Sequence, residues 1–395
     1  RRKWHIMNVP LKFSISFSLA FIISWQISAQ PHQVGHAAMS FTDPARNNRN
    51  IPVEVYYPAL TAGEDVPVSP GQFPVLSFGH GFVMDVDSYI NFSNILVPEG
   101  YIFVLSNTET GFNPSHQDLA LDLAFILHAL QAEGNDPGSL FYGAIALPNA
   151  LMGHSMGGGA SMLGAASDTI VKAVVNFAAA NTTPSAISAA ADITVPALLF
   201  SGSGDCVTPP AQHQELMYDS LASDCKTRIS ITGGGHCYFA NENFLCTFGE
   251  NSCGPDITIT REQQQDATFD FLLPWLDYFL KSEQQAWEIF ADSLASSNRI
   301  TYEQDCEMTW IREENTGFYD LKIYPVPFKD YLIIERTIQV RYVEVFDSSG
   351  RQVFEGLVGS KLPVTIKTGH LKAGIYQFLI TDINGEKISY KAFKI

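Results

Sequence analysis

Short apolar runs alternate with longer segments of helical periodicity through most of the chain. A helix is predicted from His116 to Glu133, with Ser115 as its N-cap, Asp118 three residues later and Gly134 at its end. The strand-like runs are largely apolar throughout and read IPVEVYY, FPVLSFGH, YIFVLSN, ALMGHS, VKAVVNFA, VPALLFSGSGD and RISIT. Strands that alternate with helices pair in parallel, and apolar strands need cover on both faces. The pattern predicts a doubly wound, mostly parallel α/β sheet.

The pattern changes after residue 318, where short alternating strands are separated by turns. Strands are predicted at Tyr331–Ile334, Val340–Phe346, Arg351–Phe354 and Ile375–Thr381, and an Asn-Gly pair at 384–385 signals a hairpin. The apolar residues of this part show no helical periodicity. It is predicted to form a small C-terminal β-sandwich.

The distribution of charge supports the same division. Residues 30–318 hold 33 acidic and 9 basic residues, whereas residues 319–395 hold 8 acidic and 11 basic ones. We therefore expect an α/β domain at 30–306, a linker at 307–318 and the sandwich at 319–395. The net charge of −17 argues against nucleic acids and anionic membrane surfaces as partners.

The N-terminal residues 1–29 have the pattern of a secretory signal peptide. Basic residues precede the apolar run Phe13–Ile23, and small residues around Ala29 form a cleavage site. A membrane anchor is the weaker alternative, because the run is shorter than the roughly 20 residues of a spanning helix. Six cysteines fit an oxidising compartment, and the absence of a CxxC pair argues against a structural zinc site.

The run Gly153-His154-Ser155-Met156-Gly157 follows a predicted strand and precedes a predicted helix. A strand-to-helix turn this sharp needs glycine on both sides of the serine, and it exposes the serine hydroxyl at the top of the sheet. The alternative is a Gly-rich turn with an incidental serine. The context favours Ser155 as a nucleophile.

A serine nucleophile needs a base and a carboxylate, which in this fold follow it in the order Asp or Glu, then His. Asp205 and His236 each follow a later strand, at the edge of the sheet where the elbow lies. His80 also ends a strand and is the rival base, although it precedes the serine. Helical histidines are more often surface or core residues.

Two main-chain amides are candidates to stabilise the oxyanion. Met156 directly follows the nucleophile, and Phe82 lies in the early loop Gly79-His80-Gly81. We also expect His154 and Tyr238, neighbours of the nucleophile and the base, to flank the substrate. None of this chemistry requires a cofactor.

The motifs GHSMGG, GSGDCVTPP, GGGHCYFAN and HGF resemble the dienelactone-hydrolase-like branch of α/β-hydrolases. Within it they are similar to bacterial cutinases, polyester (PET) hydrolases and platelet-activating-factor acetylhydrolases. The resemblance spans about residues 52–280 and implies the same triad and the same oxyanion donors. Polyester hydrolases of this group usually carry a stacking Trp after the strand that follows the elbow, whereas the run VVNFAAANTT offers Ala180.

The tail resembles the C-terminal sorting domain of the Bacteroidetes type IX secretion system. The motifs are YPVPF, VFDSSGRQV and LKAGIY, with a lysine near the end. The resemblance implies that the secretion machinery is a partner and that the protein is secreted or attached to the outer membrane. A carbohydrate-binding β-sandwich is the alternative.

The cysteines are expected to form three disulfides. Cys206 follows the proposed Asp and Cys237 the proposed His, so both should lie at one edge of the sheet, and some polyester hydrolases carry a similar bridge. The expected pairs are Cys206–Cys237, Cys246–Cys253 and Cys225–Cys306.

The sequence thus predicts an exported serine ester hydrolase of the carboxylesterase or cutinase kind. Its substrate is predicted to be a small ester or a polyester such as PET. A lipase or phospholipid acetylhydrolase is one alternative. A serine peptidase and a non-catalytic surface binding protein are alternatives from other classes.

Overall fold

The computed structural model describes residues 31–251, 253 and 256–306, and parts of the tail: 322–324, 329, 331–335, 340–347, 351–357, 364–372, 374–382 and 387–394. The chain forms two compact units, Arg1–Glu307 and Met308–Ile395. The predicted signal peptide and linker lie outside the described residues. Among the residues described, no helix combines the length and apolarity needed to cross a bilayer.

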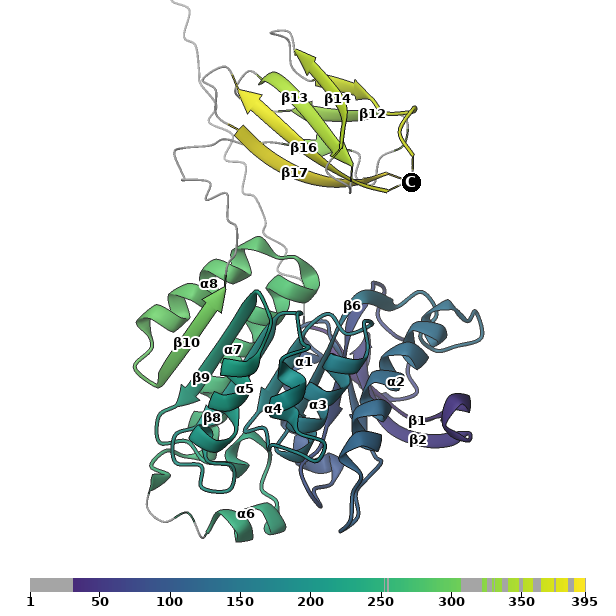
Figure 1. The fold of residues 1–395 in the computed structure, drawn as a ribbon. Helices are drawn as coiled ribbons and strands as arrows, with labels where there is room; N and C mark the ends of the chain where they lie inside the picture. The colour runs from purple at the N-terminus through teal and green to yellow at the C-terminus, as the bar shows by residue number, and fades with distance from the viewer. Residues whose placement is uncertain are drawn as a thin grey trace, which may run out of the picture. The chain divides into compact units, whose positions relative to one another are not determined.

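The first unit is built on a ten-stranded sheet in the order β10-β9-β8-β7-β6-β4-β5-β2-β1-β3 (Figure 1). The strands from β5 to β9 in this order pair in parallel, whereas β1, β2 and β10 join by antiparallel pairing. The bounds are β1 Gln33–Asp43, β2 Arg49–Ala59, β3 Gly63–Glu64, β4 Phe73–Gly79, β5 Ile102–Ser106, β6 Ile145–His154, β7 Val174–Phe177, β8 Ala197–Gly202, β9 Cys225–Ile231 and β10 Ile300–Cys306.

Helices cover both faces of this sheet. Helices α2, α3, α4 and α5 contact one another in sequence along one face, while α1, α7 and α8 lie behind the sheet in Figure 1. The bounds are α1 Ile90–Leu96, α2 His116–Asn135, α3 Met156–Ser167, α4 Ala186–Ala190, α5 Gln214–Ser220, α6 Phe244–Glu250, α7 Arg261–Lys281 and α8 Gln284–Ser296. Short 3-10 turns are η1 Pro44–Arg46, η2 Val86–Tyr89, η3 Pro210–Gln212 and η4 Cys237–Phe239.

The predicted doubly wound α/β fold is confirmed. Every residue of β4, β5, β7 and β8 is buried, because each of these strands is covered by helices on both sides. The N-cap of α2 is Ser115, as predicted, and its side chain accepts from the Asp118 N–H. The helix runs to Asn135, so Gly134 lies in its last turn, where a Cβ would come 2.8 Å from the Ile145 side chain.

The C-terminal unit contains two antiparallel sheets. One has the order β11-β12-β15 and the other β14-β13-β16-β17. Apolar side chains from both sheets, among them Leu332, Ile334, Val343 and Phe378, form one core, as in a β-sandwich. The bounds are β11 Lys322–Tyr324, β12 Tyr331–Glu335, β13 Val340–Asp347, β14 Gln352–Leu357, β15 Val364–Lys367, β16 Gly374–Asp382 and β17 Lys387–Lys394.

Candidate active site

The turn between β6 and α3 holds Ser155 in a strained backbone conformation, with φ of 55° and ψ of −118°. Neighbouring backbone leaves no room for side chains here. A Cβ at Gly153 would lie 2.2 Å from the Gly157 carbonyl oxygen, and one at Gly157 would lie 2.0 Å from the carbonyl oxygen of Gly79. Glycine at both positions therefore allows the elbow to pack against the end of β4.

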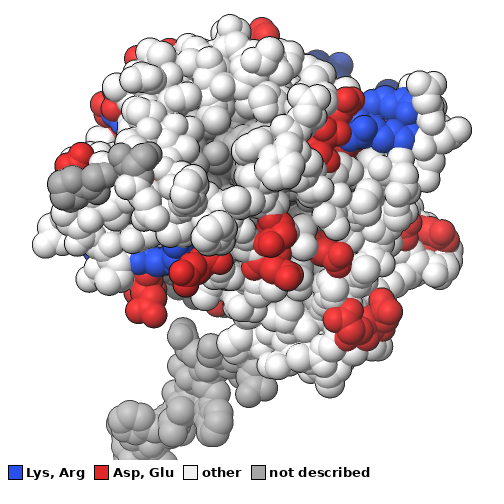
Figure 2. Space-filling view, turned by 90° about the horizontal axis from the view of Figure 1, so that it is seen from below, with Lys and Arg blue, Asp and Glu red and all other residues white. Residues whose placement is uncertain are grey.

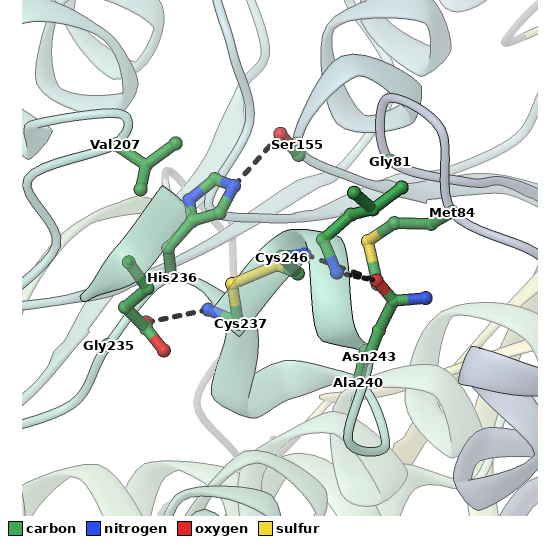
Figure 3. Close-up of a disulfide and its surroundings, with 12 residues drawn as sticks. Gly81, Met84, Ser155, Val207, Gly235, His236, Cys237, Ala240, Asn243 and Cys246 are labelled. Carbon is green, nitrogen blue, oxygen red and sulfur yellow. Dashed lines mark hydrogen bonds between the residues drawn. A yellow bond between two sulfur atoms is a disulfide. The ribbon is translucent and has the colours of Figure 1, made fainter. Parts of the chain in front are cut away.

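The structure brings Ser155, His236 and Asp205 together at the carboxyl ends of β6, β9 and β8. The His236 Nε2 lies 2.9 Å from the Ser155 Oγ, and the His236 Nδ1 lies 2.8 Å from the Asp205 Oδ2. Figure 3 shows the serine hydroxyl facing the imidazole ring. This continuous path from hydroxyl to carboxylate has the geometry of a nucleophile, a base and an orienting group.

Asp205 is 5% exposed and accepts hydrogen bonds on both carboxylate oxygens. The Oδ1 accepts from the N–H groups of Val207 and Thr208, and the Oδ2 accepts from the Thr208 hydroxyl, besides its contact with His236. Burial pushes the pKa of Asp205 upward, but the hydrogen bonds from His236 and Thr208 outweigh it, so the net shift is downward. The carboxylate is thus held in its charged form.

The loop that carries His236 is fixed from helix α7. The Gln264 side chain is fully buried, and its amide accepts from the Gly235 N–H at 2.8 Å and donates to the Gly235 carbonyl at 2.9 Å. On the other side of His236, the Arg261 guanidinium donates to the carbonyls of Cys237 and Ala240. Neither residue could be found from its local pattern, because a Gln and an Arg in the polar first turns of a helix carry no sign that one of them is buried.

Of the two candidate oxyanion donors, Phe82 lies in the loop after β4 and Met156 is the first residue of α3. Within residues 31–251, the N–H groups of Phe82 and Met156 donate to no protein acceptor, whereas the N–H of Gly81 donates to the Tyr89 hydroxyl. The rival base His80 is fully buried, and its ring nitrogens lie 2.7–2.8 Å from the main-chain carbonyls of Gly81 and Thr108. These contacts leave His80 no free nitrogen for a serine hydroxyl.

The expectation that His154 flanks the substrate is wrong. Its side chain is 0% exposed, and its ring nitrogens contact the Tyr89 hydroxyl and the His236 carbonyl. The residue before the nucleophile ends strand β6, whose side chains are buried there, and it points into the protein. Tyr238 is half-buried, with the Arg261 guanidinium 4.7 Å from its ring centre, and its contact with substrate stays a prediction.

Two of the three expected disulfide pairs are also wrong. The structure pairs Cys206 with Cys253 and Cys237 with Cys246, whereas Cys225 and Cys306 pair as predicted, opposite each other on β9 and β10. The strand ends do share one edge of the sheet. However, α6 and the residues after it return to this edge and bring a nearer partner to each thiol, so Cys237 bonds to α6 itself (Figure 3).

The surface around α6 is poor in positive charge. Figure 2 shows this face as a largely uncharged area with a hollow, and carboxylates around it. A hollow of about 430 Å³ is lined by acidic, neutral polar and apolar residues, namely Val83, Asp85, Asp87, Ser88, Glu242, Asn243, Phe244 and Leu245. None of the three triad candidates lines it. Several apolar side chains of α6 and of nearby loops are more than a third exposed: Phe82, Phe112, Val207, Phe244, Leu245 and Phe248.

Comparison with known proteins agrees with the fold and the motifs. Residues 52–250, half of the chain, match the PET hydrolase-like family, and residues 322–394 match the secretion system C-terminal sorting domain. A search of curated proteins gave no match. The sorting domain is of the type IX kind and directs the protein to secretion and surface attachment, as in Bacteroidetes. With this fold, these motifs and this match over half of its length, the chain belongs to the PET hydrolase-like family, whose activity is that of a secreted ester hydrolase.

Proposed function

We propose that the protein is a serine carboxylic ester hydrolase with Ser155 as nucleophile, His236 as base and Asp205 as the residue that orients the base. The unbroken hydrogen-bonded path from the Ser155 Oγ through His236 to the buried Asp205 carboxylate supports this proposal most strongly. A carboxylate on Nδ1 selects the tautomer that leaves Nε2 free to accept the serine proton. Burial strengthens this interaction, because little water competes for the carboxylate.

In the proposed reaction, the Ser155 Oγ attacks the acyl carbonyl while the His236 Nε2 takes its proton. The N–H groups of Phe82 and Met156 donate to the resulting oxyanion. The tetrahedral intermediate then collapses, and His236 protonates the leaving alcohol. Water then attacks the acyl-serine ester while His236 takes its proton. His236 returns this proton to the Ser155 oxygen as the C–O bond breaks, which releases the carboxylic acid and restores the free enzyme. The chemistry uses protein groups and water alone, so the proposal includes no cofactor.

The side chains around the site favour an uncharged, apolar ester. The exposed apolar side chains of Phe82, Phe244 and Phe248 can contact acyl or aromatic groups, whereas the carboxylates of Asp85 and Asp87 repel anionic substrates. A polyester has this chemistry, and so does a small neutral lipid.

The position of Ala180 bears on the choice between these substrates. Its N–H donates to the Ser155 carbonyl at 2.9 Å, so the loop after β7 borders the nucleophile without an aromatic side chain at this point. A polyester would then have to be bound by aromatic side chains at other positions, such as Phe82. A soluble short-chain ester or small lipid needs no such contact and remains the second candidate.

The test compares wild type with Ser155→Ala on nitrophenyl acetate, butyrate and decanoate and on an aromatic polyester film. We expect the variant to lose about 10⁴-fold or more in kcat, since one member of a triad supports nearly all of its chemistry. Film hydrolysis by the wild type separates a polyesterase from a simple esterase.

Ser161→Ala is the matched control, because Ser161 is a buried serine of α3, the helix that follows Ser155, and its hydroxyl donates to the Gly158 carbonyl. It should hydrolyse the same esters with a kcat close to that of the wild type. Ester turnover that survives in Ser155→Ala would rule out the proposed nucleophile. Hydrolysis of an anilide without hydrolysis of the matching nitrophenyl ester would identify a peptidase instead.

A further inference from the structure

A buried chain of hydrogen bonds joins the loop of the proposed oxyanion donor to the loop of the proposed base. The Gly81 N–H donates to the Tyr89 hydroxyl at 2.8 Å, and this oxygen lies 2.9 Å from the His154 Nδ1. On the other side of the same ring, the His154 Nε2 lies 3.0 Å from the His236 carbonyl oxygen. Tyr89 and His154 are both 0% exposed, so the chain is shielded from bulk solvent.

The acceptor at the end of this chain determines where each proton lies. A carbonyl oxygen can only accept, so the His154 Nε2 carries a hydrogen, and the Nδ1 of the neutral ring accepts from the Tyr89 hydroxyl. The Met84 sulfur, 3.1 Å from the same hydroxyl, is a weaker acceptor than an imidazole nitrogen. Burial, together with the charge on the nearby His236, lowers the pKa of His154 to about 3. The ring therefore stays neutral at ordinary pH.

The segment around Tyr89 and the segment after His236 share two further hydrogen bonds. The Asn241 N–H donates to the Ser88 carbonyl at 2.7 Å, and the Asn91 side chain donates to the Phe239 carbonyl at 2.9 Å. Packing is also close around Gly81, at the end that belongs to the oxyanion loop. A Cβ on Gly81 would lie 2.8 Å from the Met84 sulfur and 3.2 Å from the His154 Nδ1. Little free space remains for either loop to shift.

We propose that Tyr89 and His154 are positioning residues that set the distance between the Phe82 amide and the His236 imidazole. This inference rests on the proposed function. Phe82 directly follows Gly81, whose N–H is the first donor of the chain, and the last acceptor belongs to His236 itself. The oxyanion amide is used only once charge develops on the substrate oxygen. Loss of the chain should therefore lower kcat and leave KM almost unchanged.

The experiment measures kcat and KM of the full chain on nitrophenyl butyrate for wild type, Tyr89→Phe and Tyr101→Phe. We expect Tyr89→Phe to lose about 10- to 100-fold in kcat, less than complete removal of an oxyanion donor costs, with KM within about twofold. Tyr101→Phe is the control, because Tyr101 is also fully buried and its hydroxyl donates to Asp277, outside this chain. It should keep the wild-type kcat.

A second pair of variants covers the case in which Tyr89→Phe does not fold. His154→Gln can still donate to the His236 carbonyl, whereas His154→Leu cannot, so the Gln variant should keep at least about fivefold more kcat. Three outcomes would overturn the inference. His154→Gln and His154→Leu could have equal kcat, folded Tyr89→Phe could keep the wild-type kcat, or Tyr101→Phe could lose as much kcat as Tyr89→Phe. Absence of Ser155-dependent turnover in the wild type would instead overturn the proposed function.

Discussion

At the scale of single residues, the two buried titratable groups nearest His236 keep opposite charge states although both pKa values fall. Asp205 is buried but receives hydrogen bonds from His236 and Thr208, so its pKa falls and the carboxylate keeps its charge. His154 is buried with a carbonyl and a hydroxyl as partners, so its pKa falls to about 3 and the ring stays neutral. The shift of Asp205 follows from its hydrogen-bond partners, which outweigh burial, whereas the shift of His154 follows mainly from burial itself.

The shift of His154 predicts a pH dependence of stability. The folded pKa of about 3 lies below the usual 6.5, so between these values the unfolded chain binds the proton more readily, and stability falls as pH falls. Between pH 8 and pH 4.5 the loss from this group should be about 3 kcal/mol. Urea unfolding across this range should therefore show a shallower pH dependence in His154→Asn than in wild type. Parallel pH profiles for the two proteins would contradict the prediction.

At the scale of elements, α6 has the closest covalent connection to the site. Its Cys246 bonds to Cys237, the residue after His236, and Cys253 just beyond the helix bonds to Cys206, the residue after Asp205. The third disulfide, Cys225–Cys306, joins β9 to the edge strand β10. The first two disulfides therefore connect α6 and the residues just after it to the loops of Asp205 and His236. The third joins the edge strand to the sheet.

Two of these disulfides, removed one at a time, should lower stability by similar amounts but differ in their effect on kcat. From loop lengths, Cys225→Ser/Cys306→Ser should cost about 4.5 kcal/mol and Cys206→Ser/Cys253→Ser about 4 kcal/mol. Only the second pair releases the Asp205 loop, so it should lower kcat about tenfold while the first stays within about twofold. Urea unfolding and ester kinetics on the purified variants measure both effects. An equal loss of kcat in both variants would show that the Cys206–Cys253 bond does not position the loop.

At the scale of the whole molecule, the chain combines two units with separate cores and different surfaces. The described residues of the first unit contain the candidate site, and the second unit is a sandwich with its own apolar core. The acidic excess before residue 318 and the basic excess after it fit two units with different tasks. One unit would act on the ester and the other would address the protein to the secretion machinery.

This division predicts that a chain ending at residue 318 hydrolyses nitrophenyl butyrate with a kcat/KM within about twofold of the full chain. In a Bacteroidetes host, the same truncation should retain the protein in the periplasm, while the full chain reaches the cell surface. Enzyme assays and cell fractionation provide the two measurements. A large loss of kcat/KM in the purified truncated chain would mean that the tail supports the catalytic unit.

The sequence by itself determined the α/β class, the two units and the residues that the structure brings together as Ser155, Asp205 and His236. These depend on local order: a run of apolar residues makes a buried strand, and chemistry follows at its carboxyl end. Only the tertiary structure decided the partners of Cys206 and Cys237, the buried amide of Gln264 and the bridge through Tyr89 and His154. All of these except the Cys237–Cys246 bond, which spans nine residues, join segments far apart in the chain. Each partner depends on how loops cross the sheet edge, which no local pattern encodes.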